Sequence, residues 1–172
     1  MNRRSSILSL YALVLCVGTM TTSSAMAQQK SLKEQLIGIW TFASSIDTNK
    51  DGSKSNRWGP NAKGQLMLDP SGRFSFMISR ASIPKFAAGN VNQGTAEENK
   101  AVVQGMIAYI GTWSVDDASK TLITNIEAGS YPNLNGGMQK RIITSLTADE
   151  LKYTNPATTT GTSSDVIWRR AK

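Results

Sequence analysis

The alternation of apolar and polar residues from Arg73 to Ser79 is the feature that most constrains the fold of this 172-residue chain. Phe74, Phe76 and Ile78 fall on one face of an extended segment, and polar side chains dominate the other face. Such a period of two predicts a strand with one buried face. The turn sequence of residues 69–72, Asp-Pro-Ser-Gly, separates it from a short apolar strand over residues 64–69, so the two strands form a hairpin.

Six further segments have the length and the flanking turn residues of strands. They are residues 36–46, 107–115, 121–128, 138–147, 150–154 and 165–170. Eight short strands in one small domain favour a closed antiparallel barrel over an open sheet, because closure removes exposed edges. We therefore predict an all-β, eight-stranded antiparallel barrel, whose interior is either filled by side chains or holds one small ligand.

Residues 83–106 interrupt the pattern of strands. A loop rich in Pro, Gly and Asn covers residues 83–94, and Thr95 followed by Glu98 has the spacing of a capping box at a helix N-terminus. Apolar residues between 101 and 106 supply one helical face. We predict one short helix over residues 95–106 that acts as a lid or plug.

The first 27 residues have the pattern of a signal peptide. Arg3 and Arg4 form a positive region, residues 7–17 are apolar, and Ala-Met-Ala at 25–27 matches a cleavage site. We expect the processed chain, residues 28–172, to form one domain that is periplasmic or secreted and has no integral membrane span.

Residues 28–172 contain no histidine and no cysteine. Cys16, the single cysteine, lies in the signal segment; lipoprotein attachment there is an alternative, although Leu15 stands where such sites usually have a small residue. Ser-His-Asp and Cys-His catalysis and zinc sites of imidazole or thiolate are excluded. The net charge is +7, or +5 without Arg3 and Arg4, and the basic residues are scattered, so we expect no nucleic-acid partner and no cofactor.

Residues 47–58 begin like a calcium-binding EF-hand loop. Asp47, Asn49, Asp51 and Gly52 have the required spacing. However, the twelfth position is Trp58 instead of a bidentate Glu, and Asp-Gly is also a common hairpin turn. We predict a turn and no metal site.

Five sequence blocks together resemble one family. They are "LIGIW" at 36–40, "RWGPNAKGQLML" at 57–68, "IAYIGTWSVD" at 107–116, "YPNLNGGMQKR" at 131–141 and "VIWRR" at 166–170. In this order and spacing they resemble the bacterial and fungal lipocalin-like domain proteins over nearly all of residues 28–172. One departure is that Thr124 and Asn125 stand where the family often carries histidine. The resemblance implies a calycin-type barrel in which Trp40 packs across the closed end with Arg169 or Arg170 stacked on it, a structural pairing.

Candidate ligand-binding residues combine apolar side chains with a polar cluster. They are Phe74, Phe76, Tyr109, Trp113, Glu127, Asn133, Gln139 and Arg141. We expect Glu127 and Arg141 to face the interior and to pair, because burial of either charge alone costs several kcal/mol. A structural ion pair and simple filling of the core by the aromatic residues are the alternatives.

Three functions fit these features. The first is binding of a small, mostly apolar molecule in the barrel interior. The second is a cofactor-free isomerase or cyclase for a hydrophobic substrate, with Glu127 as base and Arg141 or Tyr109 as electrophile. The third is a structural envelope protein with a filled barrel. The sequence leaves the oligomeric state open.

Overall fold

The computed structural model describes residues 30–172, so the predicted signal peptide, its cleavage site and Cys16 lie outside the described residues. Nine strands and four helical segments follow one another. They are α1 (Leu32–Leu36), β1 (Gly38–Thr48), β2 (Lys54–Ser55), β3 (Lys63–Leu68), β4 (Arg73–Ser79), η1 (Val91–Gln93), α2 (Ala96–Gly105), β5 (Met106–Asp116), β6 (Thr121–Gly129), η2 (Pro132–Leu134), β7 (Met138–Leu146), β8 (Glu150–Asn155) and β9 (Ser163–Arg170).

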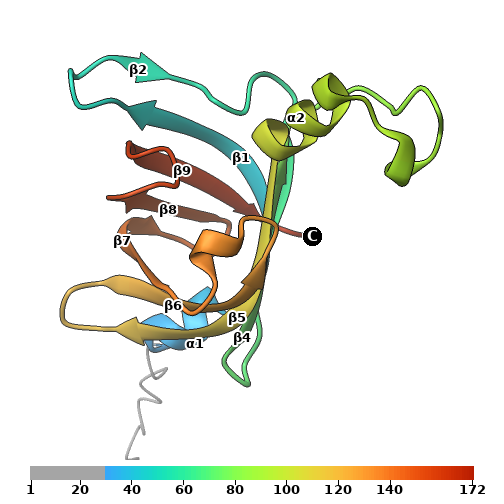
Figure 1. The fold of residues 1–172 in the computed structure, drawn as a ribbon. Helices are drawn as coiled ribbons and strands as arrows, with labels where there is room; N and C mark the ends of the chain where they lie inside the picture. Colours follow the sequence, from blue (N-terminus) through green and yellow to red (C-terminus); the bar gives the residue numbers. More distant parts are fainter. Residues whose placement is uncertain (1–29) are drawn as a thin grey trace, which may run out of the picture.

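Eight of the strands form a closed antiparallel barrel, which confirms the predicted fold class. Each long strand pairs with the next one along the chain, and β1 pairs with β9 to close the sheet (Figure 1). The two-residue strand β2 adds to the outer part of β1 and was not predicted. The hairpin of β3 and β4 has the expected register, with Leu66 opposite Phe76.

The connections differ sharply between the two ends of the barrel. Because successive strands are antiparallel, alternate connections fall at the same end. Tight turns at 69–72, 117–120 and 147–149 lie at one end. The four long connections, residues 49–62, 80–105, 130–137 and 156–162, all lie at the other, which we call the open end. The long connections are therefore gathered at the open end, and binding residues often lie on such loops.

Helix α1 closes the end that has tight turns. Ser31 Oγ accepts a hydrogen bond from the Glu34 backbone amide, and the Glu34 carboxylate accepts one from the amide of Ser31, which makes a capping box. Trp40 is fully buried there and its Nε1 donates to the Leu36 carbonyl at 2.8 Å. The predicted strand over 36–46 therefore starts later, at Gly38, because its first residue, Leu36, ends a helix.

Arg170 confirms the predicted stacking on Trp40. Its guanidinium carbon lies 4.0 Å from the centre of the Trp40 ring, and its two Nη atoms donate to the carbonyls of Ile37 and Gln35. Arg169, the alternative, instead forms an ion pair with Glu150 on the outer surface. The arginine thus ties the last strand to the C-terminal end of α1.

Helix α2 is confirmed within one residue at each end. The Thr95 side chain accepts from the Glu98 amide, and the Glu98 carboxylate accepts from the Thr95 amide. The helix leads without a linker into β5, and in Figure 1 the loop that precedes it extends away from the strands. Helix α2 therefore belongs to the open end.

The loop that resembles an EF-hand is a hairpin turn, as predicted. The Asn49 amide donates to the Ser53 carbonyl, and Gly52 adopts a φ of 83°, which favours glycine. Asp51 accepts from the amide and the hydroxyl of Ser53, whereas Asp47 points into the barrel interior, where it is 2% exposed and accepts from the Ser164 hydroxyl. The two carboxylates therefore accept hydrogen bonds from different parts of the protein and do not point toward a common centre, as the ligands of an EF-hand would.

Candidate functional site

The barrel interior is largely filled by aromatic side chains. Phe76 stacks on Tyr109 with ring centres 4.5 Å apart, and Trp168 packs edge-on against both Phe42 and Phe76. The cavity that remains inside measures only about 50 Å³, whereas pockets for drug-sized ligands span roughly 300–1,000 Å³. The interior as described is therefore too small for the apolar ligand expected there, and the aromatic residues act as core.

Arg141 lies inside the barrel, as predicted, and is 3% exposed. One Nη atom donates to the Tyr109 hydroxyl at 2.7 Å and to Gln139 Oε1 at 2.5 Å, and the other donates to Thr124 Oγ1 at 3.3 Å. Burial raises the pKa of Tyr109 to about 12, although the neighbouring guanidinium favours the ionised form. Tyr109 is therefore a neutral phenol at physiological pH.

Glu127 does not face the interior, and the prediction that it pairs with Arg141 is wrong. It is exposed, and its carboxylate forms a bidentate ion pair with Arg73 of β4 on the outer surface. Leu122 and Ile126 take the inward positions of β6, so alternation places Glu127 outside. The strands β6 and β7 are neighbours, as expected.

A β-bulge marks the position of Glu127. The register shifts so that Ile110 faces Ala128 while Gly111 faces Ile126, which leaves Glu127 as the extra residue. A Cβ on Gly111 would lie 1.9 Å from the Asn125 carbonyl oxygen, so only glycine fits there. Because Glu127 lies on the outer surface, it cannot act as the base for a substrate bound in the interior, as the isomerase or cyclase hypothesis requires.

The remaining candidate residues separate into three places. Phe76, Tyr109, Gln139 and Arg141 meet at the inner cavity. Phe74 packs edge-on against Tyr109, and Trp113 lies toward the closed end, where its Nε1 donates to the Asp69 carbonyl at 2.9 Å. Asn133 is exposed on η2, beside a separate hollow of about 270 Å³.

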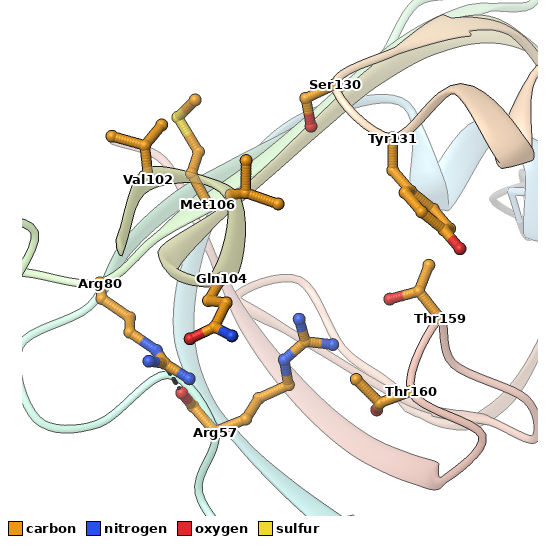
Figure 2. A pocket seen from close by; sticks show the side chains of 10 residues that line it. Arg57, Arg80, Val102, Gln104, Met106, Ser130, Tyr131, Thr159 and Thr160 are labelled. Carbon is orange, nitrogen blue, oxygen red and sulfur yellow. Dashed lines mark hydrogen bonds between the residues drawn. The ribbon is translucent and has the colours of Figure 1, made fainter. Parts of the chain in front are cut away.

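A larger cavity, of about 470 Å³, lies at the open end; we call it the mouth cavity. The side chains that line it come from all four long connections and the first residue of β5. They are Arg57, Arg80, Val102, Val103, Gln104, Met106, Ser130, Tyr131, Thr159 and Thr160. Figure 2 shows Arg57 and Gln104 pointing toward one another below α2, with Tyr131 and Thr159 across the space from them. Its volume is that of a small-molecule site.

Two arginines make the mouth cavity electropositive. Arg80 Nε donates to the Arg57 carbonyl at 2.6 Å, and the Arg57 guanidinium lies 4.4 Å from the centre of the Trp58 ring. Burial lowers the pKa of Arg57; the Asp47 carboxylate opposes this and the Arg80 cation adds to it. Within residues 30–172 neither guanidinium lies within ion-pair distance of a carboxylate. Val102, by contrast, offers apolar surface.

The sequence reasoning missed the residues of the mouth cavity. Arg57 and Tyr131 lie in the blocks at 57–68 and 131–141, but neither is among the candidate residues predicted from the sequence. A signal was available, because in an up-and-down barrel alternate connections lie at one end. The four long connections therefore had to meet, and their basic, aromatic and hydroxyl side chains were the candidates.

Among the described residues no group of three or more acidic side chains is placed to hold a metal ion. The same residues contain no helix of sufficient length and apolar character to cross a bilayer.

Solved structures with similar folds are distant in sequence. A crystal structure of a lipocalin-like protein from Bacteroides uniformis has 13% identity and a TM-score of 0.44, and the match covers 80% of this chain and 99% of that one. Bovine odorant binding protein, solved with a selenium-containing odorant, has 17% identity and a TM-score of 0.43 over 84% of this chain and 74% of its own. A de novo designed fluorescence-activating β-barrel has 11% identity and a TM-score of 0.43 over 83% and 99%.

No curated protein matches the sequence. The family model described as "Lipocalin-like domain" matches residues 37–171, which is most of the chain and nearly all of the barrel. This match agrees with the closed eight-stranded antiparallel barrel and with the blocks quoted above. The chain therefore belongs to the lipocalin-like domain family.

Proposed function

We propose that this protein binds a small, mostly apolar molecule in the mouth cavity, between α2 and the connections at the open end. The observation that carries the proposal is the size and lining of that cavity. About 470 Å³ is enough for a small organic molecule, while the interior below it has only about 50 Å³. The ligand site is thus moved from the interior, where the sequence suggested it, to the open end.

The lining favours a ligand with one polar group. Val102, Val103 and Met106 supply apolar contacts from α2 and the start of β5. Arg57 and Gln104 supply donors on the same side. Among residues 30–172 the half-buried guanidinium forms no ion pair, and the Asp47 carboxylate attracts it only from beyond ion-pair distance. A carbonyl, sulfonate or carboxylate oxygen on the ligand fits that position.

A fluorescence titration with 1-anilinonaphthalene-8-sulfonate tests the proposal, because this probe combines an apolar ring system with one anionic group. We expect saturable binding with one probe per chain. Met106→Glu, which places a charge in the apolar lining, should weaken binding at least tenfold.

Met77→Glu is the matched control. Met77 lies on the neighbouring strand β4 but is 42% exposed on the outer surface. Its substitution should leave the probe affinity unchanged. Equal affinities for parent and Met106→Glu, or no saturable binding, would leave a structural protein with a filled barrel as the better account. Export to the periplasm or medium remains part of the proposal, supported by the pattern of residues 1–27.

A further inference from the structure

The inner cavity of about 50 Å³ carries a buried positive charge without a negative partner. Arg141 is 3% exposed, and its hydrogen bonds go to a phenol, an amide and a hydroxyl, all neutral. Its guanidinium carbon also lies 5.9 Å and 5.7 Å from the ring centres of Phe76 and Tyr153, which are uncharged as well. Within residues 30–172 no carboxylate lies within ion-pair distance of it. A guanidinium withdrawn from water without an anion is unfavourable unless other interactions compensate for the lost hydration.

The other charges at this cavity do not neutralise Arg141. Asp47 and Arg57 also line it. Asp47 accepts a hydrogen bond from the Ser164 hydroxyl at 2.6 Å, and its charge acts on Arg57, whose pKa it raises against the effect of burial. Two cations and one carboxylate therefore surround the cavity, which leaves one positive charge in excess.

Hydrogen-bond donors also exceed acceptors around Arg141. A guanidinium has five N–H groups. Three of them donate to Thr124, Tyr109 and Gln139, and the Tyr153 hydroxyl is one further neutral partner, so at least one N–H group lacks a protein acceptor in the described part of the chain. Tyr109 accepts from Arg141, and its own hydroxyl proton has no acceptor among residues 30–172. The Arg141 guanidinium and the Tyr109 hydroxyl can therefore both donate to a bound ligand, and the positive charge of the guanidinium favours an anionic acceptor.

The volume of the inner cavity limits which ligands can bind there. A volume of about 50 Å³ exceeds what one water requires but excludes an aromatic ring. A planar carboxylate matches the guanidinium fork and can also accept from a phenol. Arg57 and Thr159 line both this cavity and the mouth cavity, so the inner space lies directly below the mouth.

We propose that the inner cavity is a carboxylate-binding site formed by Arg141 and Tyr109. The carboxylate is either a free small anion such as formate or the head group of an amphiphile whose apolar part occupies the mouth cavity. This site goes beyond the proposed function, because it does not require that anything bind at the mouth.

Calorimetric titrations with sodium formate and sodium octanoate, at ionic strength held constant with sodium chloride, test this site. We expect binding to the parent protein that Arg141→Lys weakens at least tenfold, because lysine keeps the charge but loses the planar fork. Tyr109→Phe should weaken it severalfold. Arg73→Gln, which removes an exposed arginine from the outer surface, should bind like the parent.

The two anions separate the two sources of carboxylate. Formate binding that depends on Arg141 identifies a free anion, and octanoate binding with the same dependence in the absence of formate binding identifies a head group. Octan-1-ol, which lacks the carboxylate, should show no dependence on Arg141. If neither anion distinguishes the parent from both Arg141→Lys and Tyr109→Phe, the proposal is wrong and the cluster is a structural element. The probe titration at the mouth is independent, so either site can fail alone.

Discussion

Truncation of Trp40 tests the register of the first strand and the closure of the barrel at the end covered by α1. The side chain is fully buried, its Nε1 donates to Leu36 at 2.8 Å, and Arg170 stacks on it at 4.0 Å. Trp40→Ala therefore removes a large buried surface, one hydrogen bond and one cation–π contact together.

The expected loss in the free energy of unfolding is about 3–5 kcal/mol, as for other buried tryptophans. This is a large part of the roughly 5–15 kcal/mol that stabilises a domain. At roughly 4 °C per kcal/mol for a domain of this size, Tm should fall by about 12–20 °C. Trp40→Phe keeps a ring but loses the N–H donor, so we expect a loss of about 1–2 kcal/mol.

Thermal and urea unfolding followed by circular dichroism measure these losses. Ile39→Ala is the control, because Ile39 is the preceding residue of β1 and is 42% exposed on the outer surface. It should change stability by less than about 0.5 kcal/mol. If Trp40→Ala melts within a few degrees of Ile39→Ala, the register of β1 is wrong and α1 does not close the barrel.

Three further predictions concern the charges, the buried phenol and export. A double-mutant cycle on stability should find no coupling between Glu127 and Arg141, because they lie on opposite sides of the barrel wall. The exposed pair of Arg73 and Glu127 should show a weak coupling that added salt reduces. Strong coupling between Glu127 and Arg141 would contradict the structure. The raised pKa of Tyr109 means that the folded state binds this proton more tightly than the unfolded chain, in which tyrosine ionises near pH ~10. The contribution of this proton to the free energy of unfolding is therefore fully present below about pH 10 and is lost as pH rises toward 12. Between these pH values the free energy of unfolding, measured with urea, should fall less steeply in Tyr109→Phe than in the parent. The same slope in both proteins would refute this. Intact mass of the exported protein should correspond to a chain that starts at Gln28, and a product that retains the leader or carries lipid would contradict the predicted cleavage.

The sequence was sufficient for most of the fold because alternation and turn chemistry are local. Phe74, Phe76 and Ile78 alternate with outward residues, of which only Met77 is apolar, and the strand is found with the predicted bounds, Arg73–Ser79. The capping box of Thr95 and Glu98 likewise fixed the start of α2. The same signal at Ser31 and Glu34 was overlooked, because the apolar residues that follow were assigned to a strand.

The candidate site was harder to predict, because the side of the barrel wall on which a side chain lies depends on the alternation along its strand, and a β-bulge shifts that alternation by one residue. Leu122, Ile123 and Ile126 place apolar residues on both faces of β6, so the strand alone did not determine which face was buried. Gln139 and Arg141 alternate with charged or exposed neighbours, and their inward placement was predicted correctly. The mouth cavity depends on how four separate connections meet, which no single segment encodes.

The most direct test of ligand binding at the open end is a crystal structure of the protein in complex with 1-anilinonaphthalene-8-sulfonate. The probe should lie in the mouth cavity, with its rings against Val102 and Met106 and its sulfonate beside Arg57. A probe bound on the outer surface of the strands, with the mouth cavity unchanged, would contradict the proposed site.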